Sequence, residues 1–374
     1  MPARPDANVL WRHVRETHRD RALLDDPLRG RGASINPANR FEKLHVEEDR
    51  SELPPDDEGP KRVQTLYLRD STQSIISRNN SPDVGFETSV NPYRGCEHGC
   101  IYCFARPTHE FLGFSAGVDF ESRIMVKENA AALLEKELSS RKWKPQTVVM
   151  SGVTDPYQPI ERELQITRGC LKVLAKFRNP VGILTKNRLV ARDIDILSEL
   201  ASHHAVAVNL SVTSLDPKLQ RILEPRTSPP AARLEAIEEL RAAGIPVGIM
   251  VAPIIPGITD HEMPSILEAC AKAGAQFAGY VLLRLPWAVA PLFERWLQEY
   301  FPERKDKVLG RIREMRGGDR LYDSKWGTRQ TGEGIFAEQI ALLFQAACRR
   351  AGMGARPKLS TDAFRRVTPQ LEFF

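Results

Sequence analysis

The chain of 374 residues is 42% hydrophobic and 27% charged, a mix that is typical of folded globular proteins and excludes disorder throughout. Its longest nearly uncharged stretches, 244–259 and 277–283, are shorter than the roughly 20 apolar residues of a membrane span, and residues 1–20 contain no apolar signal segment, so we expect a cytoplasmic protein. The formal net charge of +5 is uneven, because residues 1–60 carry 10 basic and 13 acidic side chains whereas residues 301–374 carry 15 and 9.

The first 85 residues show no sustained hydrophobic period of a strand or a helix. They contain acidic patches at 47–49 and 56–58, and the turn-forming pairs Pro54-Pro55 and Gly59-Pro60. Such a composition is typical of segments without a packed core of their own. We therefore expect a largely irregular N-terminal extension over 1–85 that includes one early helix, a core domain over 86–290 and a C-terminal segment over 291–374.

From about residue 86 onward, short β-branched runs alternate with amphipathic stretches. This alternation predicts a parallel array of six strands with helices between them. The expected strands are 87–93, 147–152, 181–186, 205–213, 246–252 and 277–285. The expected helices are 128–138, 164–177, 190–200, 230–243 and 262–273.

The strand expected at 205–213 has one apolar and one polar face. Its residues are Val206, Val208, Leu210 and Val212 on one side and Asn209, Ser211 and Thr213 on the other. Because a flat doubly wound sheet is apolar on both faces, the polar face indicates a partial (β/α)6 TIM-like barrel with a cavity in its mouth. More polar residues follow the expected strands, where βα barrels carry their chemistry. They are Thr154, Asp155, Lys186, Asn187 and Arg284.

Three of the six cysteines fall within eight residues, at Cys96, Cys100 and Cys103, directly after the first expected strand. The short spacers and two glycines let the backbone curl around a large ligand, so the spacing Cys-x3-Cys-x2-Cys predicts a [4Fe-4S] cluster. Such a cluster normally has four cysteine ligands. Three leave one iron open to bind a substrate or cofactor, as in the open metal sites of enzymes.

A zinc site of the three cysteines and His98 is the competing interpretation. A ligand only two residues from each flanking cysteine fits tetrahedral coordination poorly, and no second ligand pair follows in the sequence. The remaining thiols lie singly in apolar helical patterns, where cysteines are usually core residues. They are Cys170, Cys270 and Cys348.

The cysteine motif, with Tyr102 before its third cysteine and after the first strand of a six-stranded array, resembles the radical S-adenosylmethionine (SAM) superfamily. Further motifs within residues 86–290 resemble its DNA repair photolyase-like group, which is related to spore photoproduct lyase. These motifs are Ser151-Gly-Val-Thr-Asp155-Pro-Tyr-Gln-Pro159, Leu184-Thr-Lys186-Asn, Glu224-Pro-Arg226 and Ala252-Pro-Ile-Ile-Pro-Gly257.

The resemblance implies the chemistry and a role for each site residue. The cluster on Cys96, Cys100 and Cys103 would pass one electron to SAM, releasing methionine and a 5'-deoxyadenosyl radical that abstracts hydrogen from a substrate. Tyr102 would lie near the adenine, and Asp155 would accept the methionine ammonium group or, as part of an Asp-Pro pair, only form a turn. The other implied contacts are Ser151, Gly152 and Thr154 for the amino group, Lys186 and Arg226 for the carboxylate, Ser211 and Thr213 for the ribose, and Ala252 with Pro253 for the adenine.

One departure from the resemblance concerns the last step of the reaction. Spore photoproduct lyase quenches its product radical with a cysteine in the turn after the second strand, and residues 151–155 here contain none. Repair by that route therefore requires another hydrogen donor, such as Tyr157 or Tyr280, or the reaction differs.

The C-terminal segment combines basic and aromatic residues with an amphipathic helix expected at 335–350. Arginine and aromatic side chains in alternation bind single-stranded nucleic acid, but they can equally cap the mouth of a barrel. We therefore expect a lyase-like radical SAM enzyme with nucleic acid as its favoured substrate and a flavodoxin or ferredoxin as electron donor. The alternatives are a protein or small-metabolite substrate, and a non-catalytic zinc-containing nucleic-acid-binding protein.

Overall fold

The computed structural model describes residue 28 and residues 30–42 and 63–367. Its centre is a seven-stranded sheet in the order β10-β9-β8-β7-β6-β3-β2, in which β3 and β6 to β10 are parallel. The six parallel strands are β3 (Thr88–Val90), β6 (Val148–Met150), β7 (Val181–Thr185), β8 (Val206–Ser211), β9 (Val247–Ile254) and β10 (Phe277–Leu282). All six strands predicted from the sequence are confirmed, and the sheet of the described residues is open rather than closed into a full barrel.

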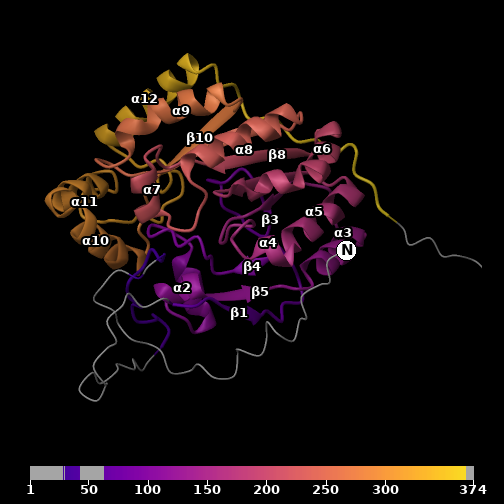
Figure 1. Ribbon diagram of the computed structural model, residues 1–374, viewed down its shortest axis with the longest axis horizontal. Helices are drawn as coiled ribbons and strands as arrows, with labels where there is room; N and C mark the ends of the chain where they lie inside the picture. Colours follow the sequence, from indigo (N-terminus) through magenta and orange to yellow (C-terminus); the bar gives the residue numbers. More distant parts are fainter. Residues whose placement is uncertain (1–27, 29, 43–62, 368–374) are drawn as a thin grey trace, which may run out of the picture.

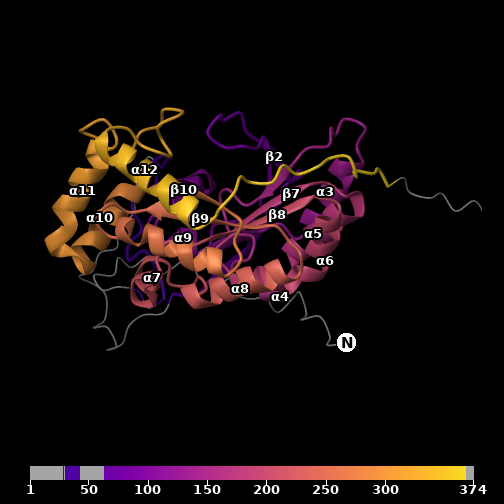
Figure 2. The same ribbon diagram turned by 90° about the horizontal axis from the view of Figure 1, so that it is seen from above.

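Helices lie along one side of these strands, as Figure 2 shows for α5, α6, α8 and α9. The helices between the strands are α3 (Ala130–Ser139), α4 (Glu161–Leu164), α5 (Ile166–Phe177), η4 (Arg188–Asp193), α6 (Ile194–Ser202), α7 (Pro217–Leu223), α8 (Pro230–Ala242), η5 (Asp260–Glu262) and α9 (Met263–Lys272). In α5 the buried residues recur at helical spacing and include Cys170, and in α9 they include Cys270. Both thiols are fully buried core residues, as predicted, and Cys348 is half-buried against the same core.

Strand β8 explains why a cavity forms beside the sheet. All six of its residues are buried, although Asn209 and Ser211 are polar. Val206, Val208 and Leu210 belong to the hydrophobic core shared with the helices, whereas Ser211 lines a cavity on the other side. The polar face predicted for this strand is therefore the face turned toward the site.

A second, smaller sheet supports the region around the cysteines. It has the order β1-β5-β4, formed by β1 (Leu66–Arg69), β5 (Arg123–Val126) and β4 (Tyr93–Arg94), and it lies at the lower part of Figure 1 beside α2 (Val118–Ser122). Strand β1 and the antiparallel edge strand β2 (Ile76–Arg78) fall within the extension that we expected to be irregular up to residue 85. The early helix expected there lies outside the described residues.

The C-terminal segment contributes α10 (Val289–Tyr300), η6 (Pro302–Arg304), α11 (Lys305–Glu314) and α12 (Ile335–Arg350). The last of these matches the predicted helix at 335–350. Helix α10 packs with α11 in a second hydrophobic cluster that also contains Ile101 and Tyr102 of the cysteine loop. The cysteine loop is thus held between the small sheet and the C-terminal helices. No helix among the described residues is long and apolar enough to cross a membrane.

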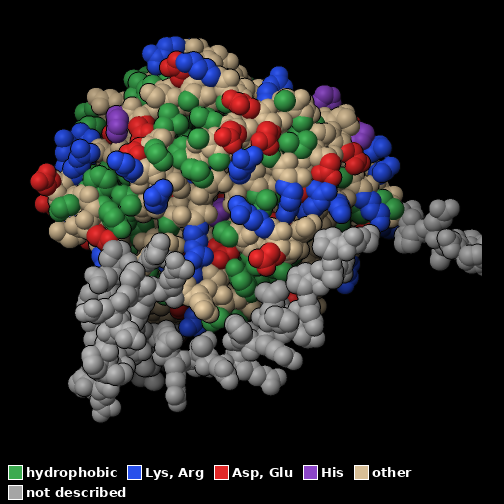
Figure 3. Space-filling model, in the orientation of Figure 1, with side chains coloured by type: hydrophobic (Ala, Val, Ile, Leu, Met, Phe, Trp, Pro, Cys, Tyr) green, Lys and Arg blue, Asp and Glu red, His purple; other side chains and the backbone are tan. Residues whose placement is uncertain are grey.

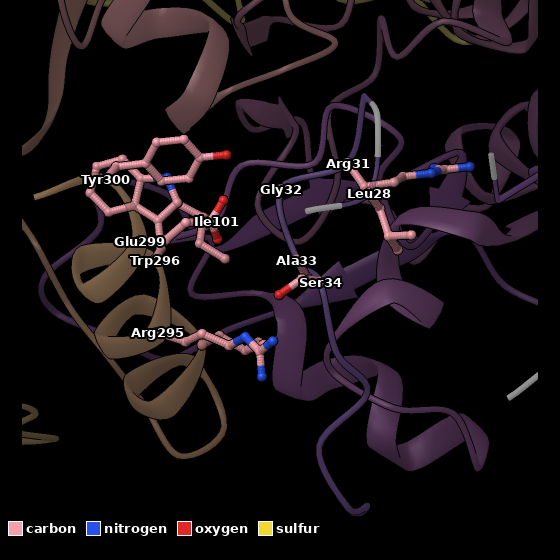
Figure 4. A pocket seen from close by; sticks show the side chains of 11 residues that line it. Leu28, Arg31, Gly32, Ala33, Ser34, Ile101, Arg295, Trp296, Glu299 and Tyr300 are labelled. Carbon is pink, nitrogen blue, oxygen red and sulfur yellow. The ribbon is translucent and has the colours of Figure 1, made fainter. Parts of the chain in front are cut away.

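The N-terminal residues 30–42 pack against the cysteine loop. Between them, Ile101 and α10 lies a cavity of only about 10 Å³, whose lining side chains are drawn in Figure 4. That volume is about the space that one water molecule needs. This contact is therefore a packing interface of the fold and not a ligand site.

Candidate active site

The cysteine loop runs from the end of β4 to the short helix η3 (Arg106–Leu112). Gly95 and Gly99 have φ angles of +78° and +67°, a region that residues with a Cβ atom rarely adopt. A Cβ atom on Gly99 would also lie 2.8 Å from Oε2 of Glu121. The two glycines let the chain turn tightly enough to present all three thiols in one place.

A buried guanidinium group holds this loop in shape. The side chain of Arg106 is fully buried, and it donates to the carbonyl oxygen of Cys100 at 2.9 Å and to that of Gly99 at 3.3 Å. Its charge is balanced by an ion pair with the equally buried Glu121. That carboxylate also accepts hydrogen bonds from the backbone N–H groups of residues 32 and 33, at 2.9 and 2.8 Å. The loop is therefore preformed by the protein itself.

All three thiols line one cavity of about 220 Å³. Burial is the main cause that raises the pKa of Cys96, Cys100 and Cys103. Buried thiols lose their protons readily only when a positive charge compensates, and a bound metal supplies such a charge. Three thiols that line one cavity therefore fit the ligand set of an iron–sulfur cluster.

His98 does not complete a zinc site. Its Nδ1 atom lies 3.3 Å from Oδ2 of Asp155, and its Nε2 atom lies 3.3 Å from the side-chain nitrogen of Asn187. Within the described part of the chain, no group of three or more His, Cys, Asp or Glu side chains converges on a single metal ion. Ligands of a cubane cluster bind different irons and need no common point, so the geometry disfavours the zinc alternative and not the cluster.

Most of the residues singled out from the sequence line the same cavity as the thiols. They are Tyr102, Ser151, Gly152, Thr154, Asp155, Lys186, Ser211 and Ala252, together with Pro253. The sequence analysis did not anticipate the apolar part of the wall. It consists of Phe104, Ala105, Val153, Leu184, Met250, Val281, Leu282 and Leu283.

The turn after β6 has an unusual backbone. Ser151 and Gly152 have φ angles of 145° and 127°. The hydroxyl group of Ser151 donates to the carbonyl oxygen of Thr154 at 3.2 Å, and the hydroxyl group of Thr154 donates to the carbonyl oxygen of Gly95 at 2.7 Å. The turn is therefore hydrogen-bonded directly to the cysteine loop. Backbone strain such as the positive φ angle of Ser151 is often found at functional sites.

Asp155 has both carboxylate oxygens engaged by the protein. Oδ1 accepts from the Thr185 hydroxyl at 2.7 Å and from the backbone N–H of Tyr157 at 2.9 Å, and Oδ2 accepts from the backbone N–H of Lys186 at 2.8 Å. Burial alone would raise the pKa of Asp155, but His98 and these hydrogen bonds lower it below its usual value. Of the two roles left open for this residue, the contacts favour the structural one, at the end of β7.

Lys186 belongs to a buried network that the sequence analysis identified only in part. Its Nζ atom lies 3.1 Å from Oε1 of Glu224 and donates to the carbonyl oxygen of Ala252 at 3.0 Å. Tyr102 and Thr213 donate to the same carboxylate through their hydroxyl groups. Burial would raise the pKa of Glu224, but Arg233 and Lys186 hold it well below its usual range.

Glu224 and Arg233 were thus missed. Arg233 is almost fully buried in α8 and forms an ion pair with Glu224, and it donates to the carbonyl oxygen of Ser211 at 2.7 Å. The motif Glu224-Pro-Arg226 was noted, but only its last residue was selected. The available signal was a carboxylate directly after the apolar end of α7.

The structure does not bring Arg226 to the cavity with the other residues. Its guanidinium group donates to the carbonyl oxygen of Gly30 at 2.9 Å and pairs with Glu97 at 3.3 Å. The two tyrosines named as hydrogen donors also lie away from the cavity lining. Tyr157 is fully buried, and its hydroxyl group donates a hydrogen bond to Oδ2 of Asp193 at 3.2 Å. The Tyr280 ring packs on the ring of Phe344.

Comparison with known proteins matches the region of the chain that contains the cysteine loop. The model of the radical SAM superfamily matches residues 90–270. An uncharacterized protein of Mycobacterium tuberculosis is 40% identical over 238 residues, which cover 63% of this chain and 69% of that protein. The radical SAM Nalpha-GlyT isomerase of Pseudomonas phage M6 is 25% identical over 233 residues, covering 61% of this chain and 46% of that protein.

Among solved structures, spore photoproduct lyase complexed with dinucleoside spore photoproduct has a TM-score of 0.53 and 17% sequence identity to this chain. The match covers 77% of this chain and 80% of that one, and at this identity it shows a shared fold. With three cysteines lining the mouth of an open parallel βα sheet and a family model matching that same region, the chain belongs to the radical SAM superfamily.

Proposed function

We propose that this radical SAM enzyme holds a [4Fe-4S] cluster on Cys96, Cys100 and Cys103, cleaves SAM reductively, and abstracts hydrogen from a nucleic-acid substrate. The observation that carries the proposal is that the three thiols, Lys186 and the turn at 151–154 line one cavity. When bound, the cluster supplies the electron that splits SAM into methionine and a 5'-deoxyadenosyl radical.

The cavity offers a place for each end of SAM. Ser151, Gly152 and Thr154 lie beside the cysteine loop, so they suit the methionine amino group next to the open iron. The ammonium group of Lys186, held by Glu224, is a cation of the cavity lining that suits the methionine carboxylate. The ribose and adenine are assigned to the remaining polar and small residues, namely Tyr102, Ser211, Ala252 and Pro253.

The hydroxyl group of Thr213 has a different role from the one first assigned. It donates to Glu224 at 2.6 Å and lies 2.9 Å from the carbonyl oxygen of Ala252, so it is not free to bind a ribose. It orients the carboxylate that holds Lys186. The apolar wall formed by Leu184, Met250 and Leu283 excludes water, which protects a radical from side reactions.

A nucleic-acid substrate is supported by the fold. The spore photoproduct lyase structures share the fold, and one of them holds SAM together with a dinucleoside spore photoproduct. The turn after β6 contains no cysteine, so a lyase reaction here would differ in its final hydrogen donor. A low-potential flavodoxin or ferredoxin is the proposed source of the electron. A protein or small-metabolite substrate is the alternative.

Product analysis tests the proposed chemistry. Anaerobically reconstituted protein, reduced with dithionite and given SAM, is expected to form 5'-deoxyadenosine and methionine in equal amounts. The variant Cys103→Ala is expected to lose this activity together with about four irons per chain. Cys348→Ala, which removes a thiol outside the cavity, is the matched control and should keep both. An iron-loaded protein that forms no 5'-deoxyadenosine would contradict the proposal.

A further inference from the structure

The mouth of the cavity carries a chain of exposed aromatic rings interleaved with arginines. Phe104 follows the third cysteine and is 47% exposed, and Arg284 follows β10. Both line the cavity, and the Cζ atom of Arg284 lies 4.4 Å from the centre of the Phe104 ring. The aromatic rim is defined here as Phe104, Phe111, Trp287 and Tyr322, with Arg40 and Arg284 between them.

The rim continues outward from Arg284. Tyr322 lies close enough to Arg284 to influence its pKa, and the Tyr322 ring centre lies 5.7 Å from that of Trp287. Arg40 stacks on the other side, with its Cζ atom 4.2 Å from the Trp287 ring centre and 5.9 Å from that of Phe111. Flat, stackable groups therefore lie both in the cavity wall, at Phe104 and Arg284, and around Trp287.

Two features show that this arrangement is not ordinary surface. Trp287 and Phe111 are 57% and 72% exposed, and clustered exposed aromatics usually mark an interaction site. In addition, Trp287 has a φ angle of +46°, which is unusual for a bulky residue and costs stability. The backbone thus holds a large ring in an exposed position despite this cost.

Arg284 supplies the charge that selects the partner. Arg284 is half-buried, and within the described residues neither a carboxylate nor a carbonyl oxygen accepts a hydrogen bond from it, although Asp83 lies near enough to raise its pKa. Arg329 and Arg316 lie close to it, although Arg329 is itself paired with Asp83. A half-buried guanidinium group in a cavity wall that donates no hydrogen bond to an anion is a binding group for a phosphate.

On the face of the molecule drawn in Figure 3, basic, acidic and apolar side chains are intermixed rather than gathered into one basic field. Arg40 is itself paired with the buried Glu110 at 2.6 Å, so Arg284 is the rim arginine that is offered to a phosphate. Stacking of bases on aromatic side chains, with arginine alongside, is the way single strands are bound.

We propose that the aromatic rim binds the single-stranded or unstacked nucleotides that flank the reacting nucleotide, with Arg284 on the adjacent phosphodiester. This inference rests on the proposed function, and it names the partner as an unpaired nucleic-acid segment. The segment must be unpaired, because a base cannot enter a narrow cavity while it is stacked in a duplex. An acidic peptide or a duplex held by its backbone alone would not use the ring faces.

Binding to the reconstituted full chain tests the rim without relying on turnover. The probe is a fluorescein-labelled 12-nucleotide single-stranded DNA, followed by anisotropy over a range of salt concentrations. Trp287→Ala is expected to weaken binding about 5-fold to 150-fold, and Trp287→Phe to restore most of it, because each stacked base contributes about 1–3 kcal/mol. Arg284→Gln is expected to lower the slope of log Kd against log salt by about 0.7, the loss of one phosphate contact on a single strand.

Matched controls remove groups of the same kind elsewhere. Lys272→Gln removes an exposed charge from α9, and Leu342→Ala removes an apolar side chain that is 65% exposed on α12. Both should bind as wild type does. Equal binding by Trp287→Ala and wild type, tighter binding of the duplex form, or binding of an acidic peptide in place of DNA would each overturn the inference.

The same preparation separates this inference from the proposed function. If the protein forms 5'-deoxyadenosine without DNA but does not bind the oligonucleotide, the role proposed for the aromatic rim is refuted and the proposed SAM chemistry is supported. If the protein binds the oligonucleotide in a way that depends on Trp287 but forms no 5'-deoxyadenosine, the role proposed for the aromatic rim is supported and the proposed SAM chemistry is refuted.

Discussion

The ammonium group of Lys186 and the carboxylate of Glu224 lie 3.1 Å apart beneath the cavity, joining the end of β7 to the end of α7. Glu224 also pairs with Arg233, so one buried carboxylate balances two cations. This arrangement places a carboxylate beside a lysine in the cavity wall, so the ammonium charge has a buried counter-charge. It provides a cation beside the thiols without leaving that cation uncompensated.

Replacing this carboxylate should be costly. Glu224→Gln keeps the shape but leaves Lys186 and Arg233 without a counter-charge, so we expect a loss of about 3–5 kcal/mol in the free energy of unfolding. Urea denaturation under anaerobic conditions measures it. In the background Lys186→Met, the same substitution should cost clearly less, and equal costs in the two backgrounds would show that the pair is not coupled.

The substitution Arg106→Lys should damage cluster binding more than overall folding. Lysine keeps the charge beside Glu121 but cannot donate to the carbonyl oxygens of Gly99 and Cys100 at the same time. We expect fewer irons per chain after reconstitution and faster loss of the visible absorption in a chelator. Arg188→Lys, at a surface pair with Glu235, is the control and should match wild type. A fully loaded, chelator-resistant Arg106→Lys protein would contradict this role.

Gly99→Ala should prevent the loop from closing. The φ angle of +67° and the short approach to Glu121 both oppose a Cβ atom. We expect a loss of more than about 1 kcal/mol in the free energy of unfolding and reduced iron content. Gly310→Ala in α11, where a Cβ atom would meet nothing within 4 Å, should instead be neutral or stabilise the helix by up to about 1 kcal/mol.

His109 should make stability depend on pH. Burial of the His109 ring lowers its pKa from 6.5 to about 4, although the hydrogen bond of Nε2 to the carbonyl oxygen of Arg123 acts in the opposite direction. As pH falls from 6.5 to about 4, the unfolded chain binds a proton that the folded chain does not. The free energy of unfolding therefore decreases across this window, by on the order of 3 kcal/mol, and is independent of His109 above it.

The comparison of wild type with His109→Gln isolates this contribution. Urea midpoints measured between pH 4 and pH 8 should show a smaller decrease for the variant. Parallel curves for the two proteins would mean that His109 is not buried in its neutral form.

The strands and helices of the core were predictable because each has a clear hydrophobic period. The spacing of Cys96, Cys100 and Cys103 was equally informative, since local sequence alone determines how such a loop can wrap a ligand. The small sheet β1-β5-β4 was not predicted, because its short strands lie outside the regular alternation of strands and helices that identified the core strands.

Contacts between side chains far apart in the sequence were the main features that the sequence analysis did not predict. Glu224 and Arg226 are two residues apart, yet one lies beneath the cavity and the other pairs with Glu97. The pairing of Arg106 with Glu121, and the meeting of Arg40 with Trp287, likewise depend on the tertiary fold. No periodicity or local motif encodes such contacts.

Electron paramagnetic resonance of the reduced, reconstituted enzyme, before and after SAM is added, tests the central claim most directly. If three cysteines hold the cluster and leave one iron open, SAM binds that iron and the spectrum changes in its g values and line shape. A full [4Fe-4S] signal that SAM leaves unchanged would contradict the account.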